Sequence, residues 1–269
     1  MIDLKRNSKK ELVPATGKRT RASSIYNPNQ NTDFKISRGK FSDFLTCPRC
    51  FYMDRVLGLD APGTPGWTLN ETTDLLLKKE FDNCRKSQTP HRLFLKNNLA
   101  HLVPFQHPDI DKWRDSLHHG LMARFLDSNI ILTGGVDDIW LNTKNERLVL
   151  ADYKSQANNK PLNAATYLSD AYKEGYKVQM DFYAFLLLKM GFEVDQTAYF
   201  LVCNADRMAD GFYGEMKFQE VLIPYQWNSD WIHGKVTEMI NLLNNNRVPV
   251  ANPSCKNCAY AQQRAIFEG

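Results

Sequence analysis

Two extended segments joined by a short polar turn constrain the fold of this chain more than any other feature. The first, residues 130–141, ends in G-G-V-D-D-I-W-L, and the second, residues 147–154, reads R-L-V-L-A-D-Y-K. The stretch between them, N-T-K-N-E, is polar, which predicts a β-hairpin. Side chains two residues apart on a strand emerge on the same face, so Asp152 and Lys154 should share a face while Tyr153 points to the other.

An acid and a base on one face of such a strand require an explanation. A buried strand rich in Leu and Val tolerates them only if they pair, bind an ion or reach a cleft, because desolvating a charge is costly. Asp137 and Asp152 could hold a hard divalent cation, with the carbonyl oxygen of Tyr153 as a third ligand. Mg²⁺ or Mn²⁺ held beside Lys154 predicts cleavage of phosphodiester bonds. The competing interpretation is a structural ion pair on an edge strand.

A helix upstream of the hairpin is the expected source of a further ligand. Capping residues and apolar spacing predict this helix over about residues 71–85, with Leu75, Leu76 and Phe81 facing inward. A carboxylate on it would complete the oxygen ligands around the cation.

Glu80 is the carboxylate we select on that helix as a metal ligand, with Asp82 and Asp74 as reserves. Asp138 follows Asp137 directly, so it falls on the opposite strand face. We therefore expect Asp138 to be solvated or to stabilise a turn, with no part in the metal site.

The remaining chain alternates helical and extended patterns. Apolar residues at helical spacing predict helices in these regions: 36–56, with a break at Pro48, 112–126, 172–190 and 229–244. Segments 194–203 and 214–223 read as strands, and 87–110 should be irregular. This alternation predicts a mixed α/β fold in which helices flank a central sheet.

Length and charge suggest one substantial folded domain with additions. The chain has 269 residues and a net charge of +4, and residues 1–33 hold seven Lys or Arg against three acidic residues, so the whole excess lies there. This predicts a basic, disordered arm that either attracts nucleic acid or is simply solvated. A folded domain over 34–260 and a tail over 261–269 would follow. No apolar run approaches the roughly 20 residues of a membrane span, so we expect no anchor, no signal peptide and a cytoplasmic location.

Four of the six cysteines form two C-x-x-C pairs, Cys47 with Cys50 and Cys255 with Cys258. Such pairs are typical of a four-thiolate site, because each offers two sulfurs and together they close a tetrahedron. The site would join the two ends of the folded region, so its role would be structural. The alternatives are Zn²⁺, which we slightly favour, a [4Fe–4S] cluster, and four reduced thiols without metal.

The glycine-led Asp137 strand, the D-x-K strand of Asp152 and Lys154, and a Q-x-x-x-Y pattern at Gln179 and Tyr183 follow one another in this order. This series resembles the PD-(D/E)XK nuclease superfamily, specifically its RecB-like branch. The resemblance implies that both aspartates bind the catalytic metal and that the lysine orients or activates water. It also implies that the Gln and Tyr support the site and contact the nucleic acid strand.

The resemblance covers roughly residues 36–260 and includes two departures. Many relatives carry a His metal ligand on the helix before the hairpin, whereas residues 71–85 contain none. Glu80 would take the place of that His because its carboxylate can bind a metal, although it matches no motif of the family. Several RecB-like nucleases hold an iron–sulfur cluster with one N-terminal and three C-terminal cysteines. Here the partition is two and two, although the C-P pair at Cys47 matches their first position.

These features predict a metal-dependent nuclease, with DNA favoured over RNA as its substrate and RNA left open. A helicase or recombination protein is a candidate partner. The chain contains no G-x-x-x-x-G-K-[ST] loop, so it should have no NTPase motor of its own. The alternative is a non-catalytic nucleic-acid-binding or helicase-associated subunit that keeps the nuclease-like fold and the cysteine site. A third interpretation is an accidental motif on a zinc-stapled α/β module.

Overall fold

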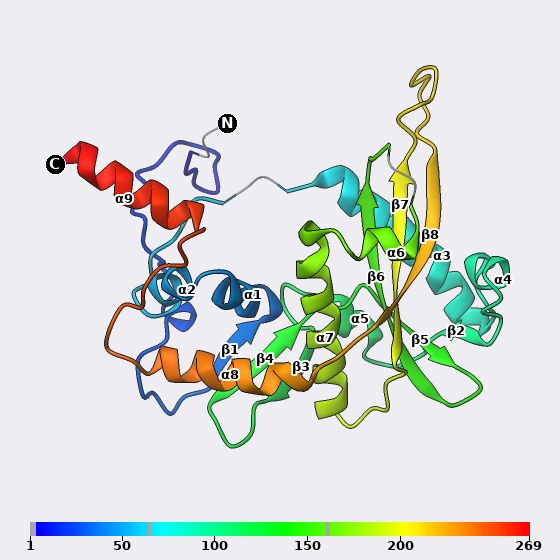
Figure 1. Cartoon of the computed structure of the whole chain (residues 1–269), viewed down its shortest axis with the longest axis horizontal. Helices are drawn as coiled ribbons and strands as arrows, with labels where there is room; N and C mark the ends of the chain where they lie inside the picture. Colours follow the sequence, from blue (N-terminus) through cyan, green and yellow to red (C-terminus); the bar gives the residue numbers. More distant parts are fainter. Residues whose placement is uncertain (1–3, 64–65, 160–161) are drawn as a thin grey trace. The chain divides into compact units, whose positions relative to one another are not determined.

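The computed structural model describes residues 4–63, 66–159 and 162–269 (Figure 1). The chain divides into two compact units. Unit 1 comprises Met1–Gly66, Arg124–Ile131 and His233–Gly269, and unit 2 comprises Trp67–Ala123 and Leu132–Ile232. Residues 34–260, predicted as one folded domain, thus contribute to both units.

A five-stranded mixed sheet forms the centre of unit 2, in the order β2-β5-β6-β7-β8 (Figure 1). Its strands are β2 (Leu102–Pro104), β5 (Asp138–Asn142), β6 (Arg147–Gln156), β7 (Thr197–Ala205) and β8 (Phe218–Gln226). β6 and β7 run parallel, and the other neighbours run antiparallel. A parallel pair needs a crossover connection. This crossover contains α6 (Ala164–Tyr167), η2 (Ala171–Lys173) and α7 (Glu174–Lys189). The predicted mixed α/β fold is confirmed.

β5 and β6 form the predicted hairpin, in which Asp138 pairs with Ala151. The first extended segment is not one strand, however. β4 (Ile130–Gly134) ends before Gly135, and β5 begins at Asp138, so Asp137 lies at the break between them. This break frees Asp137 from the regular alternation of a strand.

Two glycines explain the break before Asp137. A Cβ atom on Gly134 would lie 2.6 Å from the ring of Tyr183, and one on Gly135 would lie 2.7 Å from the Cα atom of Ser116. Both distances are shorter than real Cβ contacts, so a larger residue at either position would displace its neighbours. The G-G pair is needed because other segments approach the chain closely here.

Helices cover both faces of the central sheet. On one face, Phe81 of α3 (Thr68–Ser87) packs on Trp140 of β5 and Tyr153 of β6, with ring centroids 5.5 Å apart in both pairs. On the other face, Gln179 of α7 donates a hydrogen bond to Asp152 of β6 at 2.6 Å. The prediction that Asp152 and Tyr153 point to opposite faces is therefore confirmed.

The buried side of α3 differs from the prediction. Leu77, Phe81 and Arg85 are its buried residues, whereas Leu75 and Leu76 are 52% and 54% exposed. Residues four apart lie on one side of a helix, so these three form a single stripe toward the sheet. An arginine in this stripe indicates a charged partner inside unit 2.

The helix predicted over 112–126 is wrong. α5 (Ile110–Arg114) is followed by the strand β3 (Leu121–Arg124). Gly120 between them has a φ of +88°, and a Cβ atom there would lie 2.8 Å from the carbonyl oxygen of Gly134. Residues with a Cβ atom rarely adopt such a conformation, so the glycine ends the helical pattern. The region 87–110, predicted to be irregular, contains α4 (Arg92–Lys96) and β2.

Unit 1 is largely helical. It contains α1 (Arg38–Thr46), α2 (Pro48–Arg55), most of α8 (Asp230–Leu243) and α9 (Lys256–Glu268). The predicted break at Pro48 is confirmed, because this proline begins α2, a position where its missing N–H is not needed. The strand β1 (Phe34–Ser37) also belongs to this unit. Residues 261–269, predicted as a tail, continue α9 to Glu268.

The segment predicted as a disordered arm makes specific contacts within unit 1, although residues 1–3 lie outside the described residues. Arg19 forms ion pairs with Asp54 and Asp60. Tyr26 is buried, and its hydroxyl donates to the side chain of Asn244 at 2.9 Å. Part of the basic segment is thus fixed to unit 1, and the charge of Arg19 is paired internally.

No described helix is long and apolar enough to cross a membrane.

Candidate active site

The side chains of Asp152 and Lys154 meet on one face of β6. They form an ion pair, and both side chains are largely buried. Gln179 of α7 donates from Nε2 to Oδ1 of Asp152 at 2.6 Å and to the hydroxyl of Tyr183 at 3.2 Å. The structure therefore brings together four of the residues predicted from the sequence.

Asp137 joins this group from the break before β5. Its Oδ2 accepts a hydrogen bond from the backbone amide of Tyr153 at 2.8 Å. The amide belongs to the residue between Asp152 and Lys154, so the bond fixes Asp137 beside the charged face of β6. All three members of the predicted Asp/Asp/Lys site thus lie next to one another.

Burial controls the charge of this site. Loss of water around Asp152 raises the pKa of its carboxyl to about 7, although Lys154 opposes this and Asp137 adds to it. Burial alone would lower the pKa of Lys154, but the negative charges of Asp152 and Asp137 outweigh it and raise that pKa. These charges keep the proton on Lys154, and loss of the proton from Asp152 adds one negative charge to the site.

Oδ1 of Asp74 is buried and accepts no hydrogen bond from the described residues, although Oδ2 of the same side chain pairs with Lys78 at 2.8 Å. Oδ2 of Asp152 is also buried, and the ammonium of Lys154 faces it as its ion-pair partner. Asp74 lies on α3, where burial and then the charge of Asp137 raise the pKa of its carboxyl. Buried oxygens without donors are costly unless a cation satisfies them. An all-oxygen donor set of this kind fits Mg²⁺ or Mn²⁺.

Glu80, the predicted third ligand, lies in a different cluster. Its Oε2 is 3.1 Å from Nε2 of His91 and 3.1 Å from Nε of Arg92. Arg92 in turn donates to Glu220 of β8 at 2.6 Å. The structure therefore does not bring Glu80 to the two aspartates, because it is already bonded to residues at the start of α4.

Asp74, named as a reserve, is the carboxylate of α3 that interacts with Asp137. The sequence holds a signal that distinguishes it from Glu80. Asp74 precedes Leu77 by three residues and Phe81 by seven, which places it on the buried stripe, whereas Glu80 is one position off that stripe. The helix periodicity would have identified Asp74 if the buried stripe had been assigned correctly.

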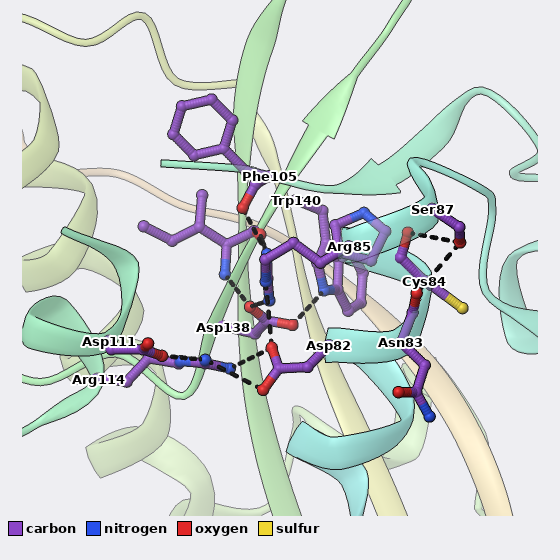
Figure 2. Close-up of polar contacts among 12 residues, drawn as sticks. Asp82, Asn83, Cys84, Arg85, Ser87, Phe105, Asp111, Arg114, Asp138 and Trp140 are labelled. Atoms are coloured by element: carbon purple, nitrogen blue, oxygen red, sulfur yellow. Dashed lines mark hydrogen bonds and ion pairs between the residues drawn. The ribbon is translucent and has the colours of Figure 1, made fainter. Parts of the chain in front are cut away.

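Asp138 was expected to be solvated or to stabilise a turn, and this is wrong. It is 0% exposed and forms an ion pair with Arg85 of α3 (Figure 2). It also accepts hydrogen bonds from the hydroxyl of Tyr153 at 2.9 Å and from the indole of Trp140 at 3.3 Å. The side chain does lie on the face opposite Asp152, but α3 covers that face and excludes water.

Arg85 connects this pair to a second ion pair, as Figure 2 shows. Its Nε lies 3.1 Å from Oδ1 of Asp82, and Arg114 donates to both oxygens of Asp82 at 2.9 and 3.2 Å. Tyr153 links this buried network to the candidate metal site, because its hydroxyl contacts Asp138 and its amide holds Asp137. This role of Arg85 was not predicted. An arginine on the apolar stripe of α3 needs a buried charged partner, which was the signal for it.

The four predicted cysteines form a compact cluster in unit 1. Sγ of Cys50 lies 3.5 Å from Cys255 and 3.4 Å from Cys258, and Cys47 lies 3.8 Å from Cys258. All four sulfurs lie within 4.8 Å of one another, and none is in a disulfide. Among the described residues they are the only set of three or more metal-binding side chains this close together.

The N-terminal ends of two helices hold cysteines of this cluster. Cys47 precedes the first residue of α2, and Cys255 precedes the first residue of α9. Burial raises the pKa of Cys47, but backbone N–H groups of Cys50 and Asn252 outweigh it and bring the pKa down to about 7. A thiolate at such a position is ready to bind a metal. The predicted cysteine cluster is confirmed, and the identity of its metal stays a prediction.

Cys258→Ser should remove the metal from this cluster. The variant loses one of four thiolates, so we expect metal affinity to fall by at least about tenfold and the melting temperature to fall with it. Metal content and the absorption spectrum of the purified protein measure this, because an iron–sulfur cluster absorbs visible light and zinc does not. The matched control is Cys84→Ser, outside the cluster. Wild-type protein that binds no metal, or a Cys258→Ser variant that keeps it, would contradict a four-thiolate site.

Comparison with known proteins identifies a family. A sequence model of the PD-(D/E)XK nuclease superfamily matches residues 35–263. A search of curated proteins finds no significant match. Among solved structures, the crystal structure of SSO0001 is similar at 13% identity and a TM-score of 0.38, with 85% of this chain and 84% of that chain covered. A likeness this weak informs neither the fold nor the function of this chain.

Proposed function

Because this chain belongs to the PD-(D/E)XK nuclease superfamily, we propose that it is a metal-dependent deoxyribonuclease whose site consists of Asp137, Asp152 and Lys154. Membership of the superfamily accounts for a nuclease-type function and for nucleic acid as the ligand. The proposed metal site rests on one observation, that two carboxylates and one ammonium meet on the buried face of the hairpin. A structural ion pair would not need a second aspartate fixed beside it.

Asp137 and Asp152 are proposed to hold Mg²⁺ or Mn²⁺, with the carbonyl oxygen of Tyr153 as a third ligand. We add Asp74 in place of Glu80. One buried oxygen of Asp74 has no donor among the described residues, although the other pairs with Lys78, whereas Glu80 is bonded to His91 and Arg92. A bound divalent cation supplies charge neutralisation at the phosphate and lowers the pKa of water.

Lys154 is proposed to act as a cationic donor to the phosphate. Its pKa is raised rather than lowered, so the side chain is poorly suited to accept a proton in this state. A divalent cation that binds Oδ2 of Asp152 would displace the ammonium of Lys154 from its ion pair with that oxygen. The freed ammonium could then donate hydrogen bonds to a phosphate oxygen, where negative charge develops during cleavage.

Gln179 and Tyr183 are proposed as positioning residues. The amide of Gln179 holds Oδ1 of Asp152, which leaves Oδ2 for the cation, and it also donates to the hydroxyl of Tyr183. This Q-x-x-x-Y helix supports assignment to the RecB-like branch, although the two-and-two partition of the cysteines departs from it. A helicase or recombination partner stays a prediction.

Cleavage of labelled DNA by the purified protein tests the proposal. We expect single- or double-stranded DNA to be cleaved with Mn²⁺ or Mg²⁺ and to stay intact with EDTA, and matched RNA to be cleaved more slowly. Gel retardation in the same samples reports binding separately. Retardation without cleavage at every metal concentration would contradict a nuclease and favour the non-catalytic nucleic-acid-binding subunit.

A further inference from the structure

A cavity of about 530 Å³ lies at the end of β6 and is lined by the segment that leads into α7. Its walls include Gln156 of β6, Tyr167 of α6, and Tyr172 and Lys173 of η2. A volume of this size is in the range of small-ligand sites. The combination of aromatic rings, an amide and an ammonium gives it the chemistry of a site for a partly aromatic anion.

The cavity adjoins the proposed metal site. Gln156 follows Lys154 by two residues on β6, so both side chains lie on the same face of the strand. Nζ of Lys154 lies 4.8 Å from the ring centroid of Tyr176, and Nζ of Lys173 lies 5.0 Å from the same centroid. One aromatic ring therefore separates the lysine of the cavity from the proposed catalytic lysine.

Tyr167 supplies a polar group that lacks a partner. The residue is 6% exposed, and its hydroxyl accepts and donates no hydrogen bond among the described residues. Leaving a buried hydroxyl unsatisfied destabilises the protein. A ligand in the cavity that bonds to this hydroxyl would remove that destabilisation.

Lys173 supplies an ammonium that is held without a carboxylate. Its Nζ lies 4.8 Å from the ring centroid of Tyr167 and donates to Oε1 of Gln156 at 3.4 Å. It forms no ion pair within the part of the chain that the structure describes. Asp170 also lines the cavity, where its Oδ1 accepts the backbone amide of Tyr172 at 3.0 Å and its negative charge acts on Lys173 without forming an ion pair. The cation is therefore available to an anionic group.

Tyr172 supplies a free aromatic face. It lines the cavity and is 91% exposed, so little of the protein packs on its ring. Its backbone amide donates to Asp170, so the main chain that carries the ring is fixed beside the cavity. Exposed rings beside cationic groups are the elements with which proteins bind unpaired bases and the adjoining phosphate.

We propose that this cavity binds one unpaired nucleotide of the substrate strand next to the cleaved phosphodiester. The base stacks on Tyr172, a phosphate contacts Lys173, and the amide of Gln156 and the hydroxyl of Tyr167 bond to the base or the sugar. The inference rests on the proposed function and makes it more specific. A base inside a duplex would first have to unstack and unpair, so this site favours a single strand or an unpaired end.

Two probes separate the base from the backbone, a fluorescein-labelled thymidine oligonucleotide and an abasic strand of the same length. Anisotropy measures their affinities in an Asp152→Asn background, which prevents cleavage. Tyr172→Ala should weaken binding of the thymidine strand about tenfold and leave the abasic strand nearly unchanged. Lys173→Gln should weaken both strands and reduce the slope of log K against log salt by about 0.7. Tyr213→Ala, which changes a tyrosine that is 87% exposed but outside the cavity, serves as the control.

Equal affinity of the Tyr172→Ala and Tyr213→Ala proteins for the thymidine strand would overturn the inference. A Tyr172→Ala variant that weakens the abasic strand equally would also overturn it, because no base would then be stacked. Absence of binding to both strands would also overturn the inference. Cleavage by the wild-type protein, measured separately, decides whether the nuclease proposal survives any of these results.

Discussion

Asp152→Asn is expected to reduce DNA cleavage by on the order of 10³-fold while the protein stays folded. Asparagine keeps an oxygen that can accept the hydrogen bond from Gln179, so the contact to α7 survives. It carries no negative charge, however, and cannot bind a divalent cation as a carboxylate does. Initial cleavage rates in Mn²⁺, together with melting temperatures, measure the two effects separately. Lys154→Ala should give a loss of similar size by removing the ammonium.

Two further carboxylates provide matched controls for this result. Asp74→Asn should weaken the response to Mn²⁺, whereas Glu80→Gln should cleave at close to the wild-type rate because Glu80 is bonded to His91 and Arg92. Protons compete with the cation for Asp152, so wild-type Mn²⁺ affinity should rise as the pH passes about 7. Wild-type cleavage by Asp152→Asn would reject the proposed site. Loss of cleavage in Glu80→Gln but not in Asp74→Asn would reject the choice of ligand.

Arg85→Met should lower the free energy of unfolding by about 3–5 kcal/mol. Methionine fills much of the same space, but it leaves Asp138 as a buried carboxylate without its cation. The indole of Trp140 and the hydroxyl of Tyr153 remain as donors to Asp138, and neither is charged. Denaturant unfolding followed by tryptophan fluorescence reports the loss.

A double-mutant cycle shows whether the lost stability belongs to the ion pair. Adding Asp138→Asn to Arg85→Met removes the unpaired charge and should restore part of the stability, which gives a coupling energy between the two positions. Lys86→Met is the matched control, because Lys86 is exposed on the next position of α3 and its loss should change stability by less than about 0.5 kcal/mol. Equal effects of Arg85→Met and Lys86→Met would show that the buried pair does not stabilise the fold.

Local periodicity explains which parts of the site could be predicted. The shared face of Asp152 and Lys154 and the opposite direction of Tyr153 follow from the alternation of a single strand. Gln179 and Tyr183 are one helical turn apart, so their common direction is also a local property. These residues are brought together as expected because each prediction needed only the geometry of one element.

Contacts between distant segments explain where prediction failed. The apolar spacing over 112–126 suits a helix, but Gly120 contacts the backbone of Gly134, and this approach cannot be seen in the local pattern. Asp138 binds Arg85 through a contact that forms when α3 packs on the sheet, and Glu80 binds His91 across the turn between α3 and α4. Asp74 was within reach of sequence analysis, because it shares the stripe of Leu77 and Phe81.

Anomalous X-ray scattering from crystals soaked in Mn²⁺ tests the central claim most directly. Data collected on both sides of the manganese absorption edge locate the ion without reference to activity. We predict a manganese peak in contact with the carboxylate oxygens of Asp137 and Asp152, and with Lys154 displaced from its ion pair. A peak elsewhere in the protein with none between these two aspartates, at a Mn²⁺ concentration that supports cleavage, would contradict the account.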